Sequence, residues 1–406
     1  MKKTRISKSR RNFLKNSTFG LVGASILPPV IKGEKRNGSI KPGKKHKLIS
    51  RTLGETGLSL PVISMGVMNA DNPRLVEAAL DAGIVHLDTA WYYQWGRNEK
   101  MIGEVLKGRP RDSYVIATKI FEIRNLSTGL FPEDAKPDTF LKKFSTSLER
   151  LGLDYVDILY LHDVTSKEMV MFEPYLDTMV KLKKEGKTRF IGVSTHRNEP
   201  EVLRTAADSH VYDVVLTAYN FKQQHREEIK KAIAYAANAG LGIIGMKAIA
   251  GSIYNFGEKI ISNPKAALKW VLQDKNITTI IAGFTTFDQM ETDLSVMENL
   301  ALTPEEKHEL EQNPTVAGLF CQQCEKCIPQ CPYNFDIPNL MRSYLYAVGY
   351  KKPGLAKDTL ESINLSSLPC TQCGSCRVNC SFGFDIKKRI LYISRLKDVP
   401  KDFLAG

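Results

Sequence analysis

The eight cysteines of this 406-residue chain all lie in its last quarter, in two runs of identical spacing. The runs are Cys321, Cys324, Cys327, Cys331 and Cys370, Cys373, Cys376, Cys380. Three thiolates on one tight loop can face three irons of a single cubane, and in two-cluster ferredoxins the fourth cysteine of each run binds the other cluster. The spacing therefore predicts two [4Fe–4S] clusters, one held by Cys321, Cys324, Cys327 and Cys380, the other by Cys370, Cys373, Cys376 and Cys331.

Zinc sites and disulfides are the two alternatives for these cysteines. Paired zinc sites take four ligands each and have no use for the repeated triplet of cysteines. Four disulfides would not require the same spacing twice. One difference separates the runs: Pro332 follows the first, whereas Ser381 follows the second. We expect this serine to affect cluster stability or potential more than occupancy.

The net charge of +13 belongs to the start of the chain. Residues 1–50 carry fourteen Lys and Arg against the single acid Glu34, and the remainder has equal numbers of basic and acidic residues. A neutral body lacks the basic surface that phosphate-backbone binding requires, so we expect no nucleic-acid partner. On length, the chain should form two to three domains.

The first segment has the pattern of a targeting signal. Ser9 to Lys15 read S-R-R-N-F-L-K, and a mildly apolar stretch broken by glycines extends to Ile31. This resembles a twin-arginine export signal, and the apolar stretch is too short for a permanent membrane span. We therefore expect a signal over residues 1–31 and a basic disordered linker over 32–50. A basic disordered tail is the alternative.

Export would fit the cysteine pattern, because clusters are inserted in the cytoplasm and a protein leaving with them needs a route for folded cargo. The expected partner is then the twin-arginine export machinery, and the expected location is the periplasm. If the signal is not used, the protein stays in the cytoplasm.

Residues 51–302 alternate short apolar runs with amphipathic stretches. Helical periodicity is clear over Lys136–Leu151 and Glu227–Ala239. Eight strand-then-helix units in about 250 residues is the count and size of a (β/α)8 barrel, and a doubly wound sheet is the alternative. We expect a hairpin over Arg51–Leu60 at the barrel bottom and a small, mainly helical cluster domain over 303–406. The expected strands are 62–67, 85–90, 114–120, 157–162, 189–194, 214–219, 242–247 and 279–283.

The active site of such a barrel lies at the carboxyl ends of its strands. Asp88, Lys119 and His162 end three neighbouring expected strands, and Tyr93 follows in the loop after Asp88. Taken singly, each has a structural explanation, such as a helix cap or a solvated lysine. Their gathering at adjacent strand ends indicates a catalytic group instead.

The motifs around these residues resemble the aldo/keto reductase family over roughly residues 51–300. Asp88-Thr89-Ala90 with Tyr93 is similar to the family's D-T-A-x-x-Y signature, and Ala117-Thr118-Lys119 and Leu161-His162 are similar to its lysine and histidine motifs. The clusters and Met246-Lys247-Ala248 are similar to a branch with a C-terminal ferredoxin-type module.

The resemblance implies hydride transfer between a nicotinamide and a small carbonyl or alcohol substrate. Tyr93 would donate a proton to the carbonyl oxygen, and His162 would orient that oxygen. Because a free phenol is a poor acid near neutrality, we expect Lys119, paired with Asp88, to lower the pKa of Tyr93.

The resemblance also implies an NADP or NAD site. Ser194 is similar to the family residue that holds the nicotinamide amide, while Thr195 replaces the usual asparagine. Gly283 and Gln289 replace the basic residues that grip a 2′-phosphate in many relatives, which weakens the case for NADPH. The expected cofactor-binding set is Ser194, Thr195, Asn220, Met246, Lys247, Gly283, Thr285 and Gln289.

Three functional hypotheses follow, because a hydride carries two electrons and a [4Fe–4S] cluster accepts one. The barrel can be a reductase or dehydrogenase whose clusters exchange electrons with a redox partner protein. The clusters can instead be structural. In the third hypothesis, the chain is an electron-transfer or redox-sensing protein on a barrel that no longer uses a nicotinamide.

Overall fold

The computed structural model describes residues 48–125, 128–250, 263–311, 321, 324–333, 335–362, 370, 373 and 376–404. The expected signal, 1–31, and all but the end of the expected linker, 32–50, lie outside these residues. Residues 44–406 group into one compact unit. In the part of the chain that is described, no helix is long and apolar enough to cross a membrane.

Eight parallel strands close into a barrel, in the order β10-β3-β4-β5-β6-β7-β8-β9. Closure confirms the barrel and excludes the doubly wound sheet. Most of the strand residues are apolar and buried, as expected for parallel strands covered on both faces. The strands are β3 (Ile63–Gly66), β4 (His86–Asp88), β5 (Val115–Ile120), β6 (Val156–Leu161), β7 (Thr188–Thr195), β8 (Val214–Ala218), β9 (Gly242–Met246) and β10 (Ile277–Ala282).

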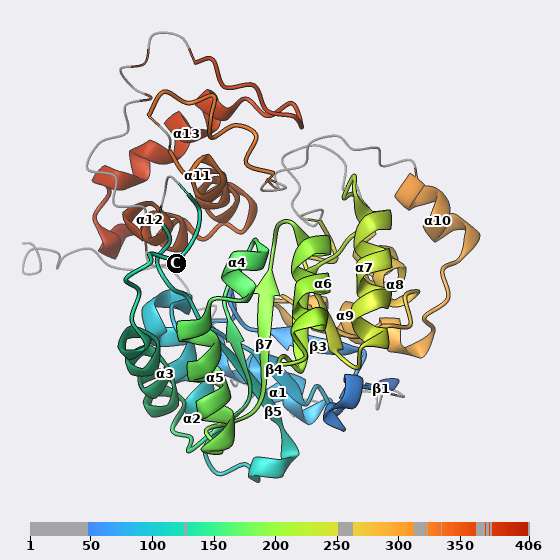
Figure 1. The fold of residues 1–406 in the computed structure, drawn as a ribbon. Helices are drawn as coiled ribbons and strands as arrows, with labels where there is room; N and C mark the ends of the chain where they lie inside the picture. The colour runs from blue at the N-terminus through green and yellow to red at the C-terminus, as the bar shows by residue number, and fades with distance from the viewer. Residues whose placement is uncertain are drawn as a thin grey trace, which may run out of the picture. The chain divides into compact units, whose positions relative to one another are not determined.

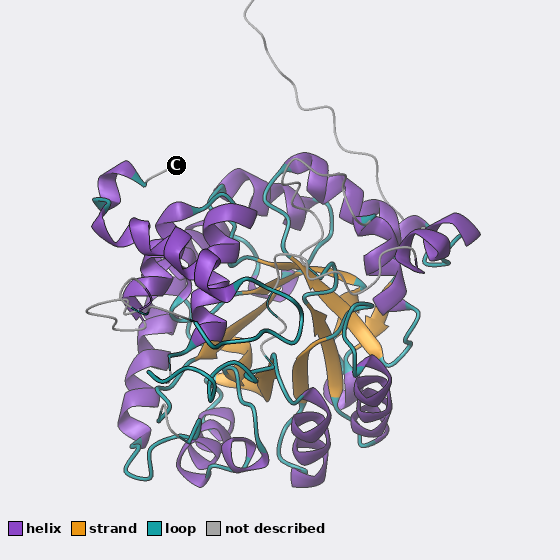
Figure 2. Ribbon diagram, turned by 90° about the horizontal axis from the view of Figure 1, so that it is seen from above, coloured by secondary structure: helices purple, strands orange, loops and turns teal. Residues whose placement is uncertain are grey.

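Helices surround the strands, as the view from above shows (Figure 2). In α3, Pro137 stands in the first turn and Gly152 at the end adopts the left-handed conformation, with Phe140 and Phe144 buried on one face. The helices are α1 (Pro73–Asp81), α2 (Arg97–Leu106), α3 (Pro137–Leu151), α4 (Lys167–Val170), α5 (Glu173–Lys184), α6 (Glu199–Ser209), α7 (Arg226–Asn238), α8 (Pro264–Leu272) and α9 (Phe287–Leu294). Short 3-10 turns are η2 (Tyr93–Gly96), η3 (Arg111–Ser113) and η4 (Ser295–Glu298).

A hairpin closes the amino-terminal end of the barrel strands, as expected. It consists of β1 (Ser50–Thr52), η1 (Gly54–Thr56) and β2 (Ser59–Pro61). Leu53 and Leu60 are fully buried among side chains of the barrel interior. The Arg51 guanidinium donates hydrogen bonds to three carbonyl oxygens around the start of β10. Because β1 begins at Ser50, the linker ends earlier than residue 50.

The segment after the barrel is helical. It comprises α10 (Pro304–Glu311), α11 (Ile337–Tyr344), the π-helical η5 (Leu345–Gly349), α12 (Pro353–Ser362), α13 (Ile386–Ser394), η7 (Arg395–Asp398) and η8 (Lys401–Phe403), several of which are labelled in Figure 1. α10 packs on the barrel helix α8, where Lys269 and Glu306 form a buried ion pair of 2.9 Å. α11 and α13 enclose a separate core with Cys327 and Cys331. The helices after α10 and the cysteine loops are thus one packed element.

Candidate active site

The four residues expected to be catalytic come together at the carboxyl ends of neighbouring strands. Lys119, on β5, forms an ion pair with Asp88 at the end of β4 and donates to the Thr89 carbonyl oxygen at 2.6 Å. The Lys119 Nζ lies 3.4 Å from the Tyr93 hydroxyl oxygen. His162 follows β6, with its ring centroid 6.1 Å from that of Tyr93. The barrel therefore assembles these side chains as the sequence predicted, while their catalytic roles stay a prediction.

The pKa of Tyr93 differs from the expected direction. Burial raises it well above the ordinary value, and the neighbouring Tyr92 and Asp88 raise it further. The expectation that this pKa is lowered is therefore wrong, because burial outweighs the positive charge of Lys119 beside the hydroxyl. Tyr93 is therefore a neutral phenol at neutral pH, which is the form that can donate a proton.

His162 is held as a neutral imidazole. Burial lowers its pKa well below the ordinary value, and the charge of Lys119 acts in the same direction. A neutral imidazole can donate one hydrogen bond, through either ring nitrogen according to its tautomer. Its Nδ1 is buried and has no partner among the described residues. His162 can thus orient an oxygen without competing with Tyr93 as the acid.

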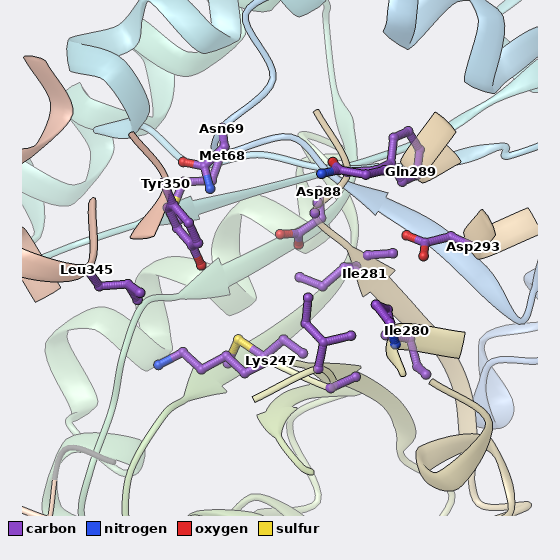
Figure 3. Close-up of a pocket in the computed structure, with 18 of the residues that line it drawn as sticks. Met68, Asn69, Asp88, Lys247, Ile280, Ile281, Gln289, Asp293, Leu345 and Tyr350 are labelled. Atoms are coloured by element: carbon purple, nitrogen blue, oxygen red, sulfur yellow. The ribbon is translucent and has the colours of Figure 1, made fainter. Parts of the chain in front are cut away.

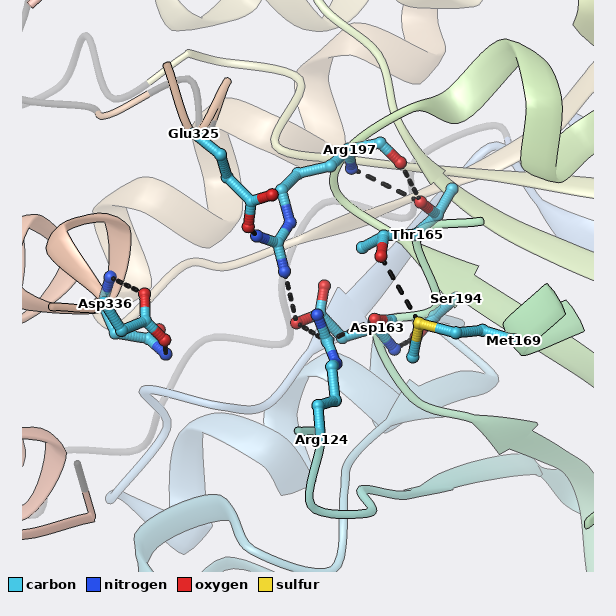
Figure 4. Close-up of polar contacts among 10 residues, drawn as sticks. Arg124, Asp163, Thr165, Met169, Ser194, Arg197, Glu325 and Asp336 are labelled. Atoms are coloured by element: carbon cyan, nitrogen blue, oxygen red, sulfur yellow. Dashed lines mark hydrogen bonds and ion pairs between the residues drawn. The ribbon is translucent and has the colours of Figure 1, made fainter. Parts of the chain in front are cut away.

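The residue after His162 organises a polar network that the sequence did not reveal. Asp163 has a positive φ of 61°, and its backbone N–H donates to the Ser194 hydroxyl oxygen at 3.0 Å. Its carboxylate contacts Arg124 at 2.6 Å and Arg197 at 3.8 Å, as Figure 4 shows. These guanidinium groups hold the pKa of Asp163 well below its usual range, against the effect of burial. Ser194, expected to bind a cofactor, therefore fixes the Asp163 loop in this structure.

A cavity of about 320 Å³ opens beside the four catalytic candidates. Of the eight expected cofactor-binding residues, Met246, Lys247, Gly283 and Gln289 line it. Figure 3 shows Asp88 between Tyr350 on one side and Gln289 and Asp293 on the other. Asp288 also lines this second side. The wall expected to hold a 2′-phosphate is therefore acidic.

The other four expected cofactor-binding residues do not line the cavity. Ser194 has been described above, and the Thr195 hydroxyl donates to the Arg197 carbonyl oxygen at 2.6 Å. Asn220 is buried and accepts from the Lys222 backbone N–H at 3.1 Å. Thr285 donates to the Gln289 side chain through its backbone N–H at 2.8 Å. These side chains are thus engaged with nearby backbone or side-chain groups.

Part of the cavity wall comes from the C-terminal segment rather than the barrel. The contributing residues are Cys321, Arg342, Leu345, Tyr346 and Tyr350. Burial raises the pKa of Tyr346, so its hydroxyl is neutral at neutral pH. Sequence reasoning missed the four of these residues that follow Cys321, because the expectation of a helical domain does not show which surface its helices cover.

Further contacts among the described residues join this segment to the barrel. Lys352 forms an ion pair with Asp71, and the Tyr346 hydroxyl lies 3.6 Å from the sulfur of Met68. Arg197 forms an ion pair with Glu325 and so links the first cysteine loop to Asp163 (Figure 4). The same arginine thus contacts both the active-site network and the cysteine loop.

The cysteines form two groups of four. The pKa of the Cys327 thiol is raised to about 12, first by burial and then by Cys321, Cys324 and Cys380 as neighbours. Burial also raises the pKa of Cys370, whose neighbours are Cys331, Cys376 and Cys373. Each group draws its fourth member from the other run, and thiols are the donors that [4Fe–4S] clusters take. The donor set thus fits two cubanes.

No three potential ligands converge on a single point among the described residues. A cubane does not need them to converge, because its four cysteines bind four different irons.

Comparison with protein families assigns both parts of the chain. Residues 64–265 match the aldo/keto reductase family, and residues 320–385 match a 4Fe-4S dicluster domain. L-galactose dehydrogenase from Arabidopsis thaliana is 29% identical over 315 residues, covering 65% of this chain and 94% of the relative. D-threo-aldose 1-dehydrogenase from a Pseudomonas species is 27% identical, covering 52% of this chain and 70% of the relative.

Solved structures show the same fold. An aldo-keto reductase from Bacillus halodurans in its holo form has a TM-score of 0.56 at 23% identity, covering 67% of this chain and 98% of that chain. A thermostable aldo-keto reductase in complex with epalrestat has a TM-score of 0.53 at 21% identity, and the match covers 66% of this chain and 100% of that chain. With the two family matches, this fold identifies the protein as an oxidoreductase of aldo/keto reductase type with a C-terminal 4Fe-4S dicluster domain.

Proposed function

We propose that this protein interconverts a carbonyl and an alcohol by hydride transfer with a nicotinamide nucleotide. The observation that carries the proposal is that Tyr93 and His162 line one cavity, with the Lys119 ammonium beside the Tyr93 hydroxyl. In the reducing direction, a carbonyl compound, a reduced nucleotide and one proton give an alcohol and an oxidised nucleotide. The balance requires one proton donor, and the neutral phenol of Tyr93 is suited to that role.

Each side chain has a distinct part in this reaction. Tyr93 donates its hydroxyl proton to the carbonyl oxygen and becomes a phenolate. The positive charge of Lys119, 3.4 Å away, stabilises that phenolate as it forms. Asp88 holds Lys119 in place through their buried ion pair, and neutral His162 orients the substrate oxygen. A positioned acid of this kind contributes about 10²–10⁴ in rate.

The cavity wall has room for a nicotinamide ring. Met246 and Gly283 line the cavity, and the space beside the Gly283 Cα is open to at least 4 Å. An apolar thioether and a glycine without a side chain allow a flat ring to lie against the wall. When bound, the nicotinamide supplies or accepts the hydride. The carboxyl groups of Asp288 and Asp293 line the cavity where a 2′-phosphate would need basic partners, and this favours NADH over NADPH. Burial raises the pKa of Asp293 to about 7, so the charge there comes mainly from Asp288.

The names of two relatives suggest a substrate class to test. Both are named as dehydrogenases of aldoses or of a single sugar. An aldose offers a hydroxyl at C1 for oxidation in the reverse direction, with Tyr93 as the base. We therefore include aldoses with simple aldehydes and ketones among the candidate substrates.

Electron transfer is a second candidate role for the dicluster domain. Cys321, an expected cluster ligand, lines the cavity that holds Tyr93. This position supports a cluster close to the proposed site of hydride chemistry, which a purely structural cluster would not need. Reduction of the clusters on anaerobic addition of NADH and substrate, seen by electron paramagnetic resonance, would support this role. Clusters that stay oxidised during turnover would contradict it.

The decisive experiment uses the cluster-loaded protein purified without oxygen. NADH and NADPH oxidation is followed against a panel of aldehydes, ketones and sugars, in wild type and in Tyr93→Phe. Tyr235→Phe is the matched control, because this half-exposed tyrosine lies on α7 and bonds only Asp208 among the contacts described. We expect Tyr93→Phe to lose about 10²-fold or more in turnover while nucleotide binding and iron content stay unchanged. Equal turnover in Tyr93→Phe and wild type would refute the assignment.

We also propose export through the twin-arginine route, on the basis of the Ser9–Lys15 motif alone. Residues 1–47 lie outside those described, so the support is the sequence pattern. Replacing Arg10 and Arg11 by lysine should keep the protein in the cytoplasm, as shown by cell fractionation. Unchanged distribution of this variant would contradict export by this route.

A further inference from the structure

Arg342 is a cation that the dicluster domain contributes to the cavity of the barrel. It lies on α11 and lines the cavity with Tyr93 and His162. The side chain is partly buried. Among the described residues it has no hydrogen bond or ion pair, which is unusual for a guanidinium with five donors.

The carboxylates nearest to Arg342 are already engaged elsewhere. Asp163 contacts Arg124 and Arg197. Asp336 caps α11 by accepting from the Asn339 backbone N–H at 3.1 Å and from its side chain at 2.6 Å. Neither supplies a dedicated partner, so the donors of Arg342 remain for something else.

Other basic side chains lie around Arg342. Lys247 lines the same cavity, and its pKa is lowered to about 7, first by burial and then by the charge of Arg342. Arg124 and Arg197 are engaged by Asp163 and Glu325, whereas Arg342 has no such carboxylate partner among the described residues. Guanidinium groups bind carboxylates and phosphates through two parallel hydrogen bonds.

We propose that Arg342 binds an oxyanion of the substrate, so that the enzyme prefers carbonyl or sugar substrates that carry a carboxylate or phosphate. This inference rests on the proposed function, because it assigns the remote end of the substrate whose reacting end lies at Tyr93. It also gives the dicluster domain a part in substrate selection. A barrel without this domain would lack the residue.

Matched substrate pairs test the proposal in the full, cluster-loaded protein. Galacturonate is compared with galactose in oxidation, and 4-oxobutanoate with butanal in reduction, so that each pair differs by one carboxylate. The variants are Arg342→Gln and Arg342→Lys, with Arg395→Gln as a control at an exposed position of the same domain. Iron content and nucleotide affinity are measured for each variant.

We expect the acidic member of at least one pair to be preferred by wild type. A charged hydrogen-bonded contact corresponds to about 10–100-fold in kcat/KM, and Arg342→Gln should lose that factor for the acid only. Arg342→Lys should retain part of it. Equal losses for the acidic and neutral members would overturn the proposal and indicate a structural role. A loss confined to nucleotide affinity would assign Arg342 to the cofactor phosphates instead.

A binding measurement separates this inference from the proposed function. Succinate, which cannot react, is titrated calorimetrically into wild type and Arg342→Gln. If no carbonyl is turned over, the proposed function fails, yet succinate binding that is lost in Arg342→Gln would still support the anion site. Equal affinity, or no binding to either protein at millimolar succinate, would overturn it.

Discussion

The hydroxyl of Tyr93 is the residue-scale feature with the clearest dependence on pH. Burial raises its pKa well above the ordinary value, so the phenol is protonated throughout the neutral range. Carbonyl reduction uses this protonated form, which is fully present below the pKa. Alcohol oxidation uses the phenolate, which is scarce below the pKa and increases as the pH rises.

We therefore expect kcat for reduction to stay nearly constant between about pH 6 and 9, while kcat for oxidation rises by about tenfold per pH unit. The measurement is a pair of pH–rate profiles on the same substrate couple. Tyr93→Phe should lack the rising limb of oxidation. An oxidation rate that levels off below pH 8 in wild type would mean that a different group is the base.

The cysteines allow a second residue-scale prediction, because each cluster should depend on both runs. Cys380→Ala should damage the same cluster as Cys321→Ala, and Cys331→Ala the same cluster as Cys370→Ala. Each variant should keep about four of eight iron atoms, with matching electron paramagnetic resonance spectra within each pair. If Cys380→Ala instead matches Cys370→Ala, each run binds its own cluster.

The residues at the site could be predicted to different degrees. Asp88, Lys119 and His162 stand at strand ends, and the barrel topology alone brings such positions together. Ser194 and Thr195 stand equally near a strand end, yet their hydroxyls bond to the neighbouring loops. Whether such a hydroxyl bonds a ligand or a nearby loop depends on the conformation of that loop. The pattern of residue types along the sequence does not determine this conformation.

At the scale of elements, the strands were predictable because they are short, mostly apolar runs separated by amphipathic stretches. The docking of α11 and η5 was not predictable, since it depends on contacts between residues far apart in sequence, such as Lys352 with Asp71. The first helix past residue 302 likewise packs on the barrel, through Lys269 and Glu306. Local periodicity contains no information about such pairs.

The hairpin that closes the barrel should stabilise it without taking part in catalysis. Leu60 is fully buried against the barrel interior, so Leu60→Ala should lower the free energy of unfolding by about 2–5 kcal/mol. The matched control is Leu48→Ala, because the Leu48 side chain is 37% exposed. This substitution should change the free energy of unfolding by no more than about 0.5 kcal/mol. Urea unfolding followed by circular dichroism tests both.

Turnover at low temperature should be nearly unchanged in Leu60→Ala, because the hairpin lies at the end of the barrel opposite Tyr93. A large loss of kcat with an intact fold would show that the hairpin affects the active site as well.

At the scale of the whole molecule, the clusters should support the cavity wall. Cys327 and Cys331 pack in the same core as α11, and α11 and η5 bring Arg342, Leu345 and Tyr346 to the cavity. Removing the iron deprives this core of its central cross-links, whereas the barrel keeps its own larger core. The cysteine loops and the active site are thereby coupled through packing.

Anaerobic iron removal with a chelator should therefore raise KM strongly, while the barrel stays folded by circular dichroism. Limited proteolysis should then cut within residues 337–350 and spare the barrel strands. Reassembly with iron and sulfide is the control, and it should restore both KM and protection. Unchanged kinetics in the iron-free protein would show that the cavity wall forms without clusters, leaving electron transfer as their remaining role. If substrate affinity and protection from proteolysis are lost with the iron and return with it, the two metal centres stabilise the part of the domain that completes the active site.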